Sequence, residues 1–258
     1  MSTPQRPPGG PAVETTTRFG RPFRHFKVAI SAGTQALAWA RQEDAPGGAT
    51  VVADVEVSPL GFRGRIWHAP AEATLACAMV LRPQLPAEEG DLTWLLAAVG
   101  ALNGAEAVSG RSLAACWPDT VVDAQNLDAQ SQEPVVGVRA EIQLGPGTVR
   151  SAVISLRFDL PRLGLGPDRR DDLLEAVVNA LGAASDSLAG EDGAAGLAAA
   201  YGQRCAQLDR RVKIQLLPKG EVRGVVGGVD HTARLMLRSP ADVVEHVTID
   251  MVRELQVV

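Results

Sequence analysis

The chain has 258 residues, a net charge of −5 and a pI near 5.4. This acidic balance argues against a general binder of nucleic acids or anionic membranes. No uninterrupted apolar run reaches the ~18 residues of a membrane span, and the N-terminus lacks the apolar core of a signal peptide.

Sulfur and imidazole ligands are sparse. The three cysteines, Cys77, Cys116 and Cys205, have no C-x-x-C spacing, and the four histidines are scattered. We therefore expect neither a disulfide set nor a zinc site, and a reduced cytoplasm is the expected location.

The order of apolar and turn-forming segments divides the chain into three parts. Residues 1–24 are rich in Pro, Gly, Thr and Arg and are expected to form a flexible tail. Residues 25–208 should form one domain. Its helices are predicted over Thr34–Arg41, with Thr34 as N-cap, Leu92–Asn103, Asp168–Leu188 and Leu197–Leu208. Its extended segments are predicted at residues 50–55, Thr74–Leu81, Leu113–Val122, Val135–Leu144 and Thr148–Asp159.

Residues 209–258 change in character. Short apolar segments alternate there with the turn signals Pro218-Lys219-Gly220, Gly227-Gly228 and Ser239-Pro240. This spacing is typical of a small SH3-like barrel. The predicted fold class is therefore α+β: a mixed or antiparallel sheet of about five to seven strands packed by helices, followed by a C-terminal SH3-like barrel.

The segment from Ser112 to Asp123 is a strand that must break at Trp117-Pro118, because proline has no N–H for a sheet and restricts its predecessor. It resembles the K-W-P-N-D strand of the biotin protein ligase family. Other motifs in family order are Gly33-Thr34-Gln35, which resembles its S-T-N helix start, and residues 61–70, which resemble its arginine-glycine loop. The C-terminal segments around Arg211, Gly220, Gly228 and Leu235 resemble its terminal barrel.

The resemblance covers nearly all of the chain beyond the tail and implies a biotin/lipoate ligase-like fold. It also implies a ligand site. The motif-matching positions are Thr34, Gln35, Arg63, Gly64, Arg65, Trp67, Trp117 and Gly137.

The chain departs from the family where the chemistry would occur. Leu60 and Phe62 stand at two arginine positions of the loop that folds over biotin and the acyl-adenylate, Cys116 stands at the lysine position, and Pro134 stands at a second lysine position. The glycines of the family's G-I-G-I-N strand are absent, and we expect Ile154 and Leu156 to crowd the pocket instead. Adenylation needs cations that offset phosphate charge, and losing one such donor typically costs ~10²–10³ in rate.

Three functions follow from this pattern. The first is a ligase-like pseudoenzyme with a binding or scaffolding role toward a biotin or lipoyl carrier domain or a carboxylase subunit. The second is a divergent active biotin or lipoate ligase, in which Arg63 and Arg65 contact phosphate and ATP, biotin and Mg²⁺ are required. The third is an acyltransferase that uses Cys116, as in the related octanoyltransferases; this requires a lowered thiol pKa.

Several residues also have purely structural interpretations. Cys116 can be a small buried hydrophobe, Trp67 a core anchor and the two arginines solvated loop residues. The proline-rich N-terminus is too short for the winged helix-turn-helix domain of ligases that double as repressors, so operator binding is not expected. Neither nucleic acid nor membrane is an expected partner, and a homodimer remains an alternative.

Overall fold

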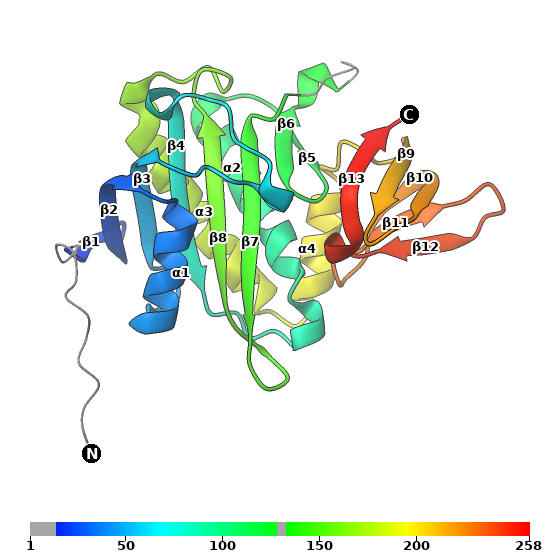
Figure 1. The fold of residues 1–258 in the computed structure, drawn as a ribbon, viewed down its shortest axis with the longest axis horizontal. Helices are drawn as coiled ribbons and strands as arrows, with labels where there is room; N and C mark the ends of the chain where they lie inside the picture. Colours follow the sequence, from blue (N-terminus) through cyan, green and yellow to red (C-terminus); the bar gives the residue numbers. More distant parts are fainter. Residues whose placement is uncertain (1–13, 128–132) are drawn as a thin grey trace.

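The computed structural model describes residues 14–127 and 133–258 and places two sheets side by side (Figure 1). The larger, eight-stranded sheet has the order β1-β2-β3-β4-β8-β7-β6-β5. It is antiparallel except for the β2–β3 pair. Its strands are β1 Thr16–Arg18, β2 Arg21–Ala29, β3 Thr50–Glu56, β4 Thr74–Leu81, β5 Leu113–Cys116, β6 Thr120–Asp123, β7 Val136–Leu144 and β8 Val149–Asp159.

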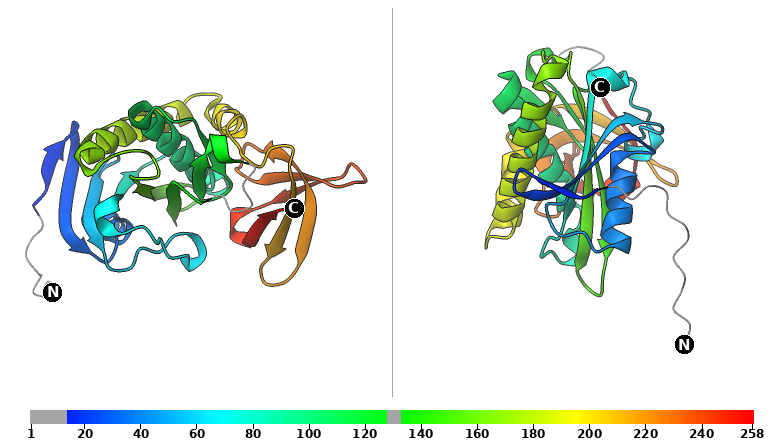
Figure 2. Two further views of the ribbon diagram at one scale, coloured as in Figure 1. Left: turned by 90° about the horizontal axis from the view of Figure 1, so that it is seen from above. Right: turned by 90° about the vertical axis from the view of Figure 1, so that its left-hand side faces the viewer.

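Helices cover both faces of this sheet (Figure 2). They are α1 Ala32–Gln42, α2 Leu92–Ser109, α3 Arg170–Leu188 and α4 Gly193–Gly202. Short 3₁₀ turns are η1 Phe62–Gly64, η2 Ala71–Ala73, η3 Ala87–Glu89, η4 Ala124–Asn126, η5 Pro167–Arg169 and η6 Ile249–Met251. The core under α2 and α3 takes Ile154 and Leu156 from β8, whereas Val153 belongs to the smaller core under α1. Alternate residues of β8 thus serve opposite faces, as the two-residue period of a strand requires.

Helix α2 is apolar on nearly all sides because it lies between the sheet and its neighbouring helices α3 and α4. By length and composition it is the one described helix that could cross a membrane, but 67% of it is buried. This burial is typical of a core helix.

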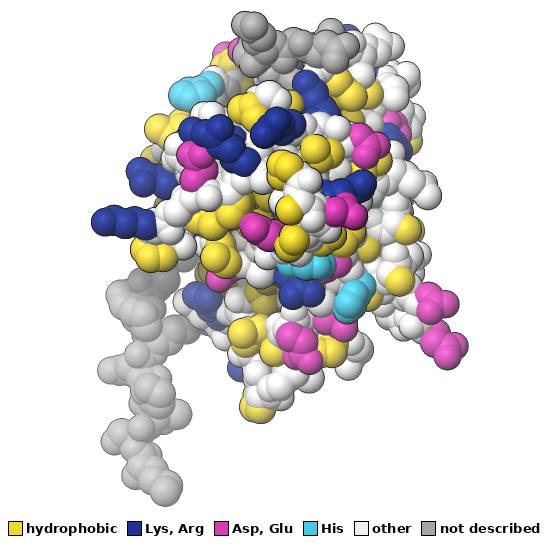
Figure 3. Space-filling model, turned by 90° about the vertical axis from the view of Figure 1, so that its right-hand side faces the viewer, with side chains coloured by type: hydrophobic (Ala, Val, Ile, Leu, Met, Phe, Trp, Pro, Cys, Tyr) yellow, Lys and Arg dark blue, Asp and Glu magenta, His cyan; other side chains and the backbone are white. Residues whose placement is uncertain are grey.

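The C-terminal residues form a five-stranded antiparallel sheet in the order β12-β11-β10-β9-β13. Its strands are β9 Arg211–Leu216, β10 Glu221–Val229, β11 Leu235–Arg238, β12 Val244–Val247 and β13 Val252–Val257. This arrangement confirms the predicted fold class and is consistent with the SH3-like barrel. Acidic, basic and apolar side chains are interspersed over this end of the molecule (Figure 3).

Trp117 joins the two sheets. Its side chain is only 2% exposed, and its Nε1 donates to the carbonyl oxygen of Ala233 at 3.1 Å. The backbone of Trp117 exchanges two hydrogen bonds with the Gln207 side chain, at 2.8 and 3.2 Å. Satisfied buried polar groups of this kind fix the position of the C-terminal sheet against β5.

Some predicted boundaries were wrong. The ordered sheet begins with β1 and β2, inside the expected 1–24 tail, although residues 1–13 of that tail lie outside the described residues. These strands, together with the split at Trp117-Pro118, bring the sheet to eight strands rather than five to seven.

Two predicted helix boundaries also differ from the structure. Helix α4 ends at Gly202 instead of Leu208. The N-cap of α1 is Ser31, whose hydroxyl accepts from the Thr34 amide at 3.0 Å. The division into domains at residue 208 remains a prediction.

Candidate functional site

The loop between β3 and η2 crosses the α1-side face of the sheet at β7 and β8 (Figure 1). Arg63 and Gly64 have positive φ values of 54° and 75° within η1. The Phe62 ring packs edge-on against Trp94, with ring centroids 5.4 Å apart. The loop is thereby folded back on the domain, over the position that the motif comparison predicts for a ligand.

Both loop arginines have partners within the chain. Arg63 Nε donates to the carbonyl oxygen of Val252 at 3.1 Å, and its Nη2 donates to that of Asp250. Arg65 forms an ion pair with Asp119. Burial raises the pKa of Asp119, and the positive charge of Arg65 opposes that rise. These two guanidinium groups therefore connect the loop to the C-terminal sheet and to the strand break.

A buried ion pair lies beneath the loop. Arg157 of β8 pairs with Glu56 at the end of β3, and their side chains are 5% and 4% exposed. The other carboxylate oxygen of Glu56 accepts from the amide of Ala32 at 2.7 Å, at the first turn of α1. Arg157 Nη1 also donates to the carbonyl oxygen of Leu60 at 3.2 Å. Because an unpaired charge at this depth is costly, these contacts fix β3, β8, α1 and the loop together.

Strand β7 contributes a second pair, in which Arg139 Nη2 lies 3.1 Å from Glu141 Oε1. A hollow of about 300 Å³ lies beside it. Its lining residues are Gly61, Phe62, Arg63, Gly64, Trp94, Arg139, Ala140 and Glu141. Its charged lining residues are thus two arginines and one glutamate, and Glu141 offsets the charge of Arg139.

The predicted site residues are only partly brought together. Trp67 lies over Gly137, where an added Cβ would be 3.2 Å from the indole ring. Thr34 and Gln35 lie in the first turn of α1, on the same face of the sheet as the loop. Trp117 is buried against the C-terminal sheet instead, so its position does not suit a ligand contact.

The expectation that Ile154 and Leu156 crowd the pocket was wrong. Both side chains belong to the core under α2. The residues of β8 beside the loop and α1 are Ser155 and Arg157. Strict alternation along β8 would have given this result from the sequence.

Cys116 is half-buried at the end of β5. Burial raises the pKa of its thiol to about 12, with smaller contributions from Cys205 and Asp119. A nucleophilic cysteine needs the opposite shift. The pairing of Cys116 with Thr120 across the β5–β6 turn agrees with a structural role.

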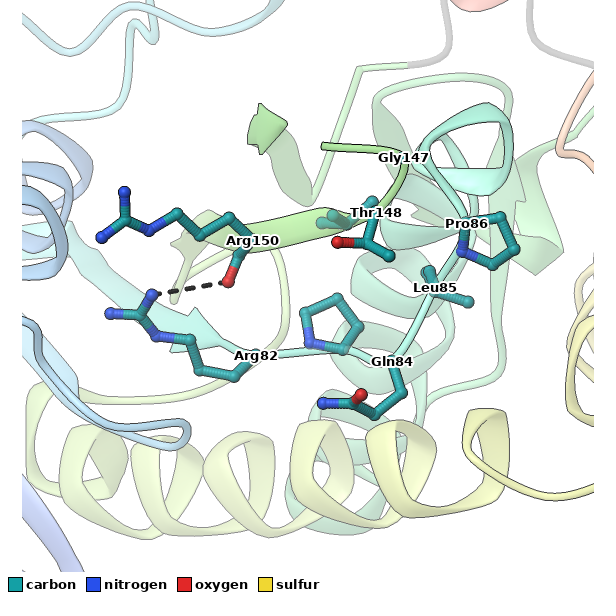
Figure 4. A pocket seen from close by; sticks show the side chains of 9 residues that line it. Arg82, Gln84, Leu85, Pro86, Gly147, Thr148 and Arg150 are labelled. Atoms are coloured by element: carbon teal, nitrogen blue, oxygen red, sulfur yellow. Dashed lines mark hydrogen bonds between the residues drawn. The ribbon is translucent and has the colours of Figure 1, made fainter. Parts of the chain in front are cut away.

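A larger hollow of about 490 Å³ lies elsewhere, by the β7–β8 hairpin. Arg82 and Arg150 extend on one side of it, and Thr148 and Pro86 lie on the other (Figure 4). The Arg82 guanidinium is already engaged by Asp44 and by backbone carbonyls that include that of Ala45. Among residues 14–127 and 133–258, no cluster of three or more His, Cys, Asp or Glu side chains is placed to hold a metal ion.

No family model matches the chain. Over 140 residues, 54% of the chain, its sequence is 28% identical to the bifunctional ligase/repressor BirA of Bacillus spizizenii. It is 27% identical to the protein of the same name from Bacillus subtilis. This part of the chain is therefore similar in sequence to two bifunctional ligase/repressor proteins. The matched part is 41% of each curated relative, so the chain spans less than half of their length.

Solved structures share the fold of this ligase-like chain. The biotin protein ligase of Aquifex aeolicus in complex with biotin and ATP superposes with a TM-score of 0.68 and 14% identity, covering 92% of this chain and 99% of that one. A biotin protein ligase-like protein of unknown function from Silicibacter gives a TM-score of 0.66 at 13% identity, covering 91% and 96%. The fold prediction made from the motif order is confirmed.

Proposed function

We propose that this chain is a biotin protein ligase-like binding or scaffolding protein that forms acyl-adenylates poorly or not at all. One observation carries the proposal: the four described arginines around the loop are engaged within the chain. Arg63 and Arg65 bind backbone carbonyls and Asp119. Arg139 and Arg157 pair with Glu141 and Glu56.

Phosphoryl chemistry depends on cations that are free to offset the charge of ATP. Leu60, Phe62 and Cys116 carry no positive charge. The remaining arginines would have to leave their partners before they could bind ATP. For Arg157 that exchange would also leave Glu56 buried without its counter-ion. Each arginine would have to give up a partner within the chain before it could bind phosphate, and this cost supports weak nucleotide binding.

The proposed partner is a biotin or lipoyl carrier domain, or a carboxylase subunit that contains one. This choice rests on the similarity to biotin protein ligases and on the retained C-terminal sheet. A cytoplasmic location also remains a prediction.

A divergent active ligase is the second candidate. It is favoured by the exposure of Arg65, whose side chain is 60% accessible, and by the position of Arg63 at the edge of the 300 Å³ hollow. Two exposed cations could turn toward a nucleotide if the loop opened. The acyltransferase function has no comparable support, because the pKa of the Cys116 thiol is raised and a nucleophilic cysteine needs the thiolate.

Incubation of the full chain with ATP, Mg²⁺, labelled biotin or octanoate, and a purified carrier domain separates these functions. We expect carrier binding without label transfer. ATP-dependent label on the carrier, lost in Arg65→Ala, would establish the active ligase. The acyltransferase is tested with an octanoyl thioester of the carrier domain as donor: transfer of the octanoyl group to the Cys116 sulfur with release of the donor thiol, without ATP and lost in Cys116→Ala, would establish it.

A further inference from the structure

The carboxylate of Glu56 occupies a position that resembles a bound ligand. One oxygen accepts from the Ala32 amide at the N-terminus of the 11-residue helix α1, and the other pairs with Arg157. A helix N-terminus and a guanidinium both favour bound anions. Here both are directed at a carboxylate of the same chain.

A third polar group points into this region without a partner. Ser155 is 4% exposed, and its Oγ has no hydrogen-bond partner among the described residues. A Cβ at Gly33 would collide with this hydroxyl, so Ser155 Oγ is directed at the first turn of α1. Buried hydroxyls normally have a hydrogen-bond partner, so the unpartnered Oγ of Ser155 leaves a donor unused at the first turn of α1.

The surroundings limit which ligand can enter. Glu141 also faces Gly33, at 3.8 Å from the position of an added Cβ, but it is paired with Arg139. The Leu60 carbonyl lies over the guanidinium of Arg157. Space and charge therefore suit one small monoanion, of the size of the Glu56 carboxylate, and oppose a polyphosphate.

We infer that Glu56, Arg157 and the first turn of α1 form a carboxylate-binding site that the chain fills with its own side chain. In the wild-type protein the site is closed to anions from solution. Removing Glu56 opens it to formate or acetate, with Arg157 and the Ala32 amide as donors. The inference rests on these contacts and does not depend on whether the chain forms acyl-adenylates.

The test is chemical rescue of the full-length Glu56→Ala variant, followed by thermal unfolding in formate, acetate or chloride at equal ionic strength. Formate at about ten times its dissociation constant should raise the Tm of this variant by about 3 °C. Chloride at the same ionic strength should have a much smaller effect, and the wild-type chain should not distinguish the salts.

Three controls distinguish specific binding at the Glu56 position from a general effect of salt on stability. Glu221→Ala removes a carboxylate from an exposed pair with Arg223 and should show no rescue. Glu56→Gln leaves the position filled, so it should also be insensitive. The double variant Glu56→Ala/Arg157→Leu removes the guanidinium, and its response to formate should be lost.

Equal rescue of Glu221→Ala or of the double variant would overturn the inference, as would a folded Glu56→Ala chain that is indifferent to formate. If Glu56→Ala does not fold in chloride, refolding from urea in formate replaces the thermal assay. Recovery of folded protein in formate supports the site. Failure in both salts contradicts it, because an anion that restored the two lost contacts would restore the fold.

Discussion

Arg63 Nε lies 3.1 Å from the carbonyl oxygen of Val252, a residue 189 positions away in the sequence. This contact joins the loop over the candidate site to the edge strand β13 of the C-terminal sheet. The left-handed φ of 54° at Arg63 is uncommon for a residue with a side chain, and it persists because the surrounding contacts determine it. The C-terminal sheet therefore holds the loop in place without a ligand.

Replacing Arg63 should release the loop. Arg63→Ala removes the hydrogen bonds to Asp250 in η6 and to Val252 in β13, and we expect a loss of about 1 kcal/mol in unfolding free energy. Amide hydrogen exchange of residues 58–66 should become faster. Arg223→Ala, at an exposed ion pair, is the matched control and should leave the loop unchanged. Unaltered exchange in Arg63→Ala would show that the contact does not restrain the loop.

The buried pair should behave as a unit. Arg157→Met leaves the Glu56 carboxylate without its cation and should cost about 3–5 kcal/mol in unfolding free energy, measured in urea. The double variant Glu56→Gln/Arg157→Met should be more stable than Arg157→Met alone, because no charge remains buried. Additive losses in the double variant would mean that the two side chains do not interact strongly.

Cys116 should react slowly with iodoacetamide in the folded chain. A pKa raised from 9.0 to about 12 reduces the thiolate fraction near neutral pH by about a thousandfold, and only the thiolate reacts. The rate should therefore keep rising with pH beyond 9 instead of levelling there. Peptide mapping by mass spectrometry isolates Cys116 from Cys77 and Cys205, and the urea-unfolded chain supplies the reference rate. A plateau below pH 9 in the folded protein would contradict the buried environment.

Restoring the family lysine alone should not restore activity. In Cys116→Lys the new ammonium lies near Asp119, whose charge already affects the thiol, and Leu60, Phe62 and Pro134 remain uncharged. Biotin-dependent pyrophosphate release from ATP should stay at background in this variant. Release well above that of the wild type would show that the lysine position is the main defect.

The sequence predicted the elements better than their contacts. The Gly145-Pro146-Gly147 turn between two apolar segments predicted the β7–β8 hairpin, because turn residues between alternating runs act locally. The break at Trp117-Pro118 likewise separates β5 from β6. Strand β1 was missed because its three residues, Thr16–Arg18, carry no apolar pattern and form only by pairing with β2.

The candidate site was less predictable because it depends on partners distant in sequence. The pair of Glu56 and Arg157 spans 101 positions, and the motif comparison did not connect the two residues. An arginine within the apolar β8 segment was the available signal, since a charge in a buried strand requires a partner. Trp117 was assigned to the site by motif position, whereas the structure uses it to anchor the C-terminal sheet.

Calorimetric titration of the wild-type chain with ATP, in the presence of Mg²⁺ and biotin, tests most directly whether partners within the chain keep the arginines around the loop from binding phosphate. We expect a dissociation constant weaker than ~1 mM, which corresponds to a binding free energy of no more than about 4 kcal/mol. Micromolar binding of ATP that is abolished by Arg65→Ala would contradict the account and identify the chain as a divergent, functional ligase.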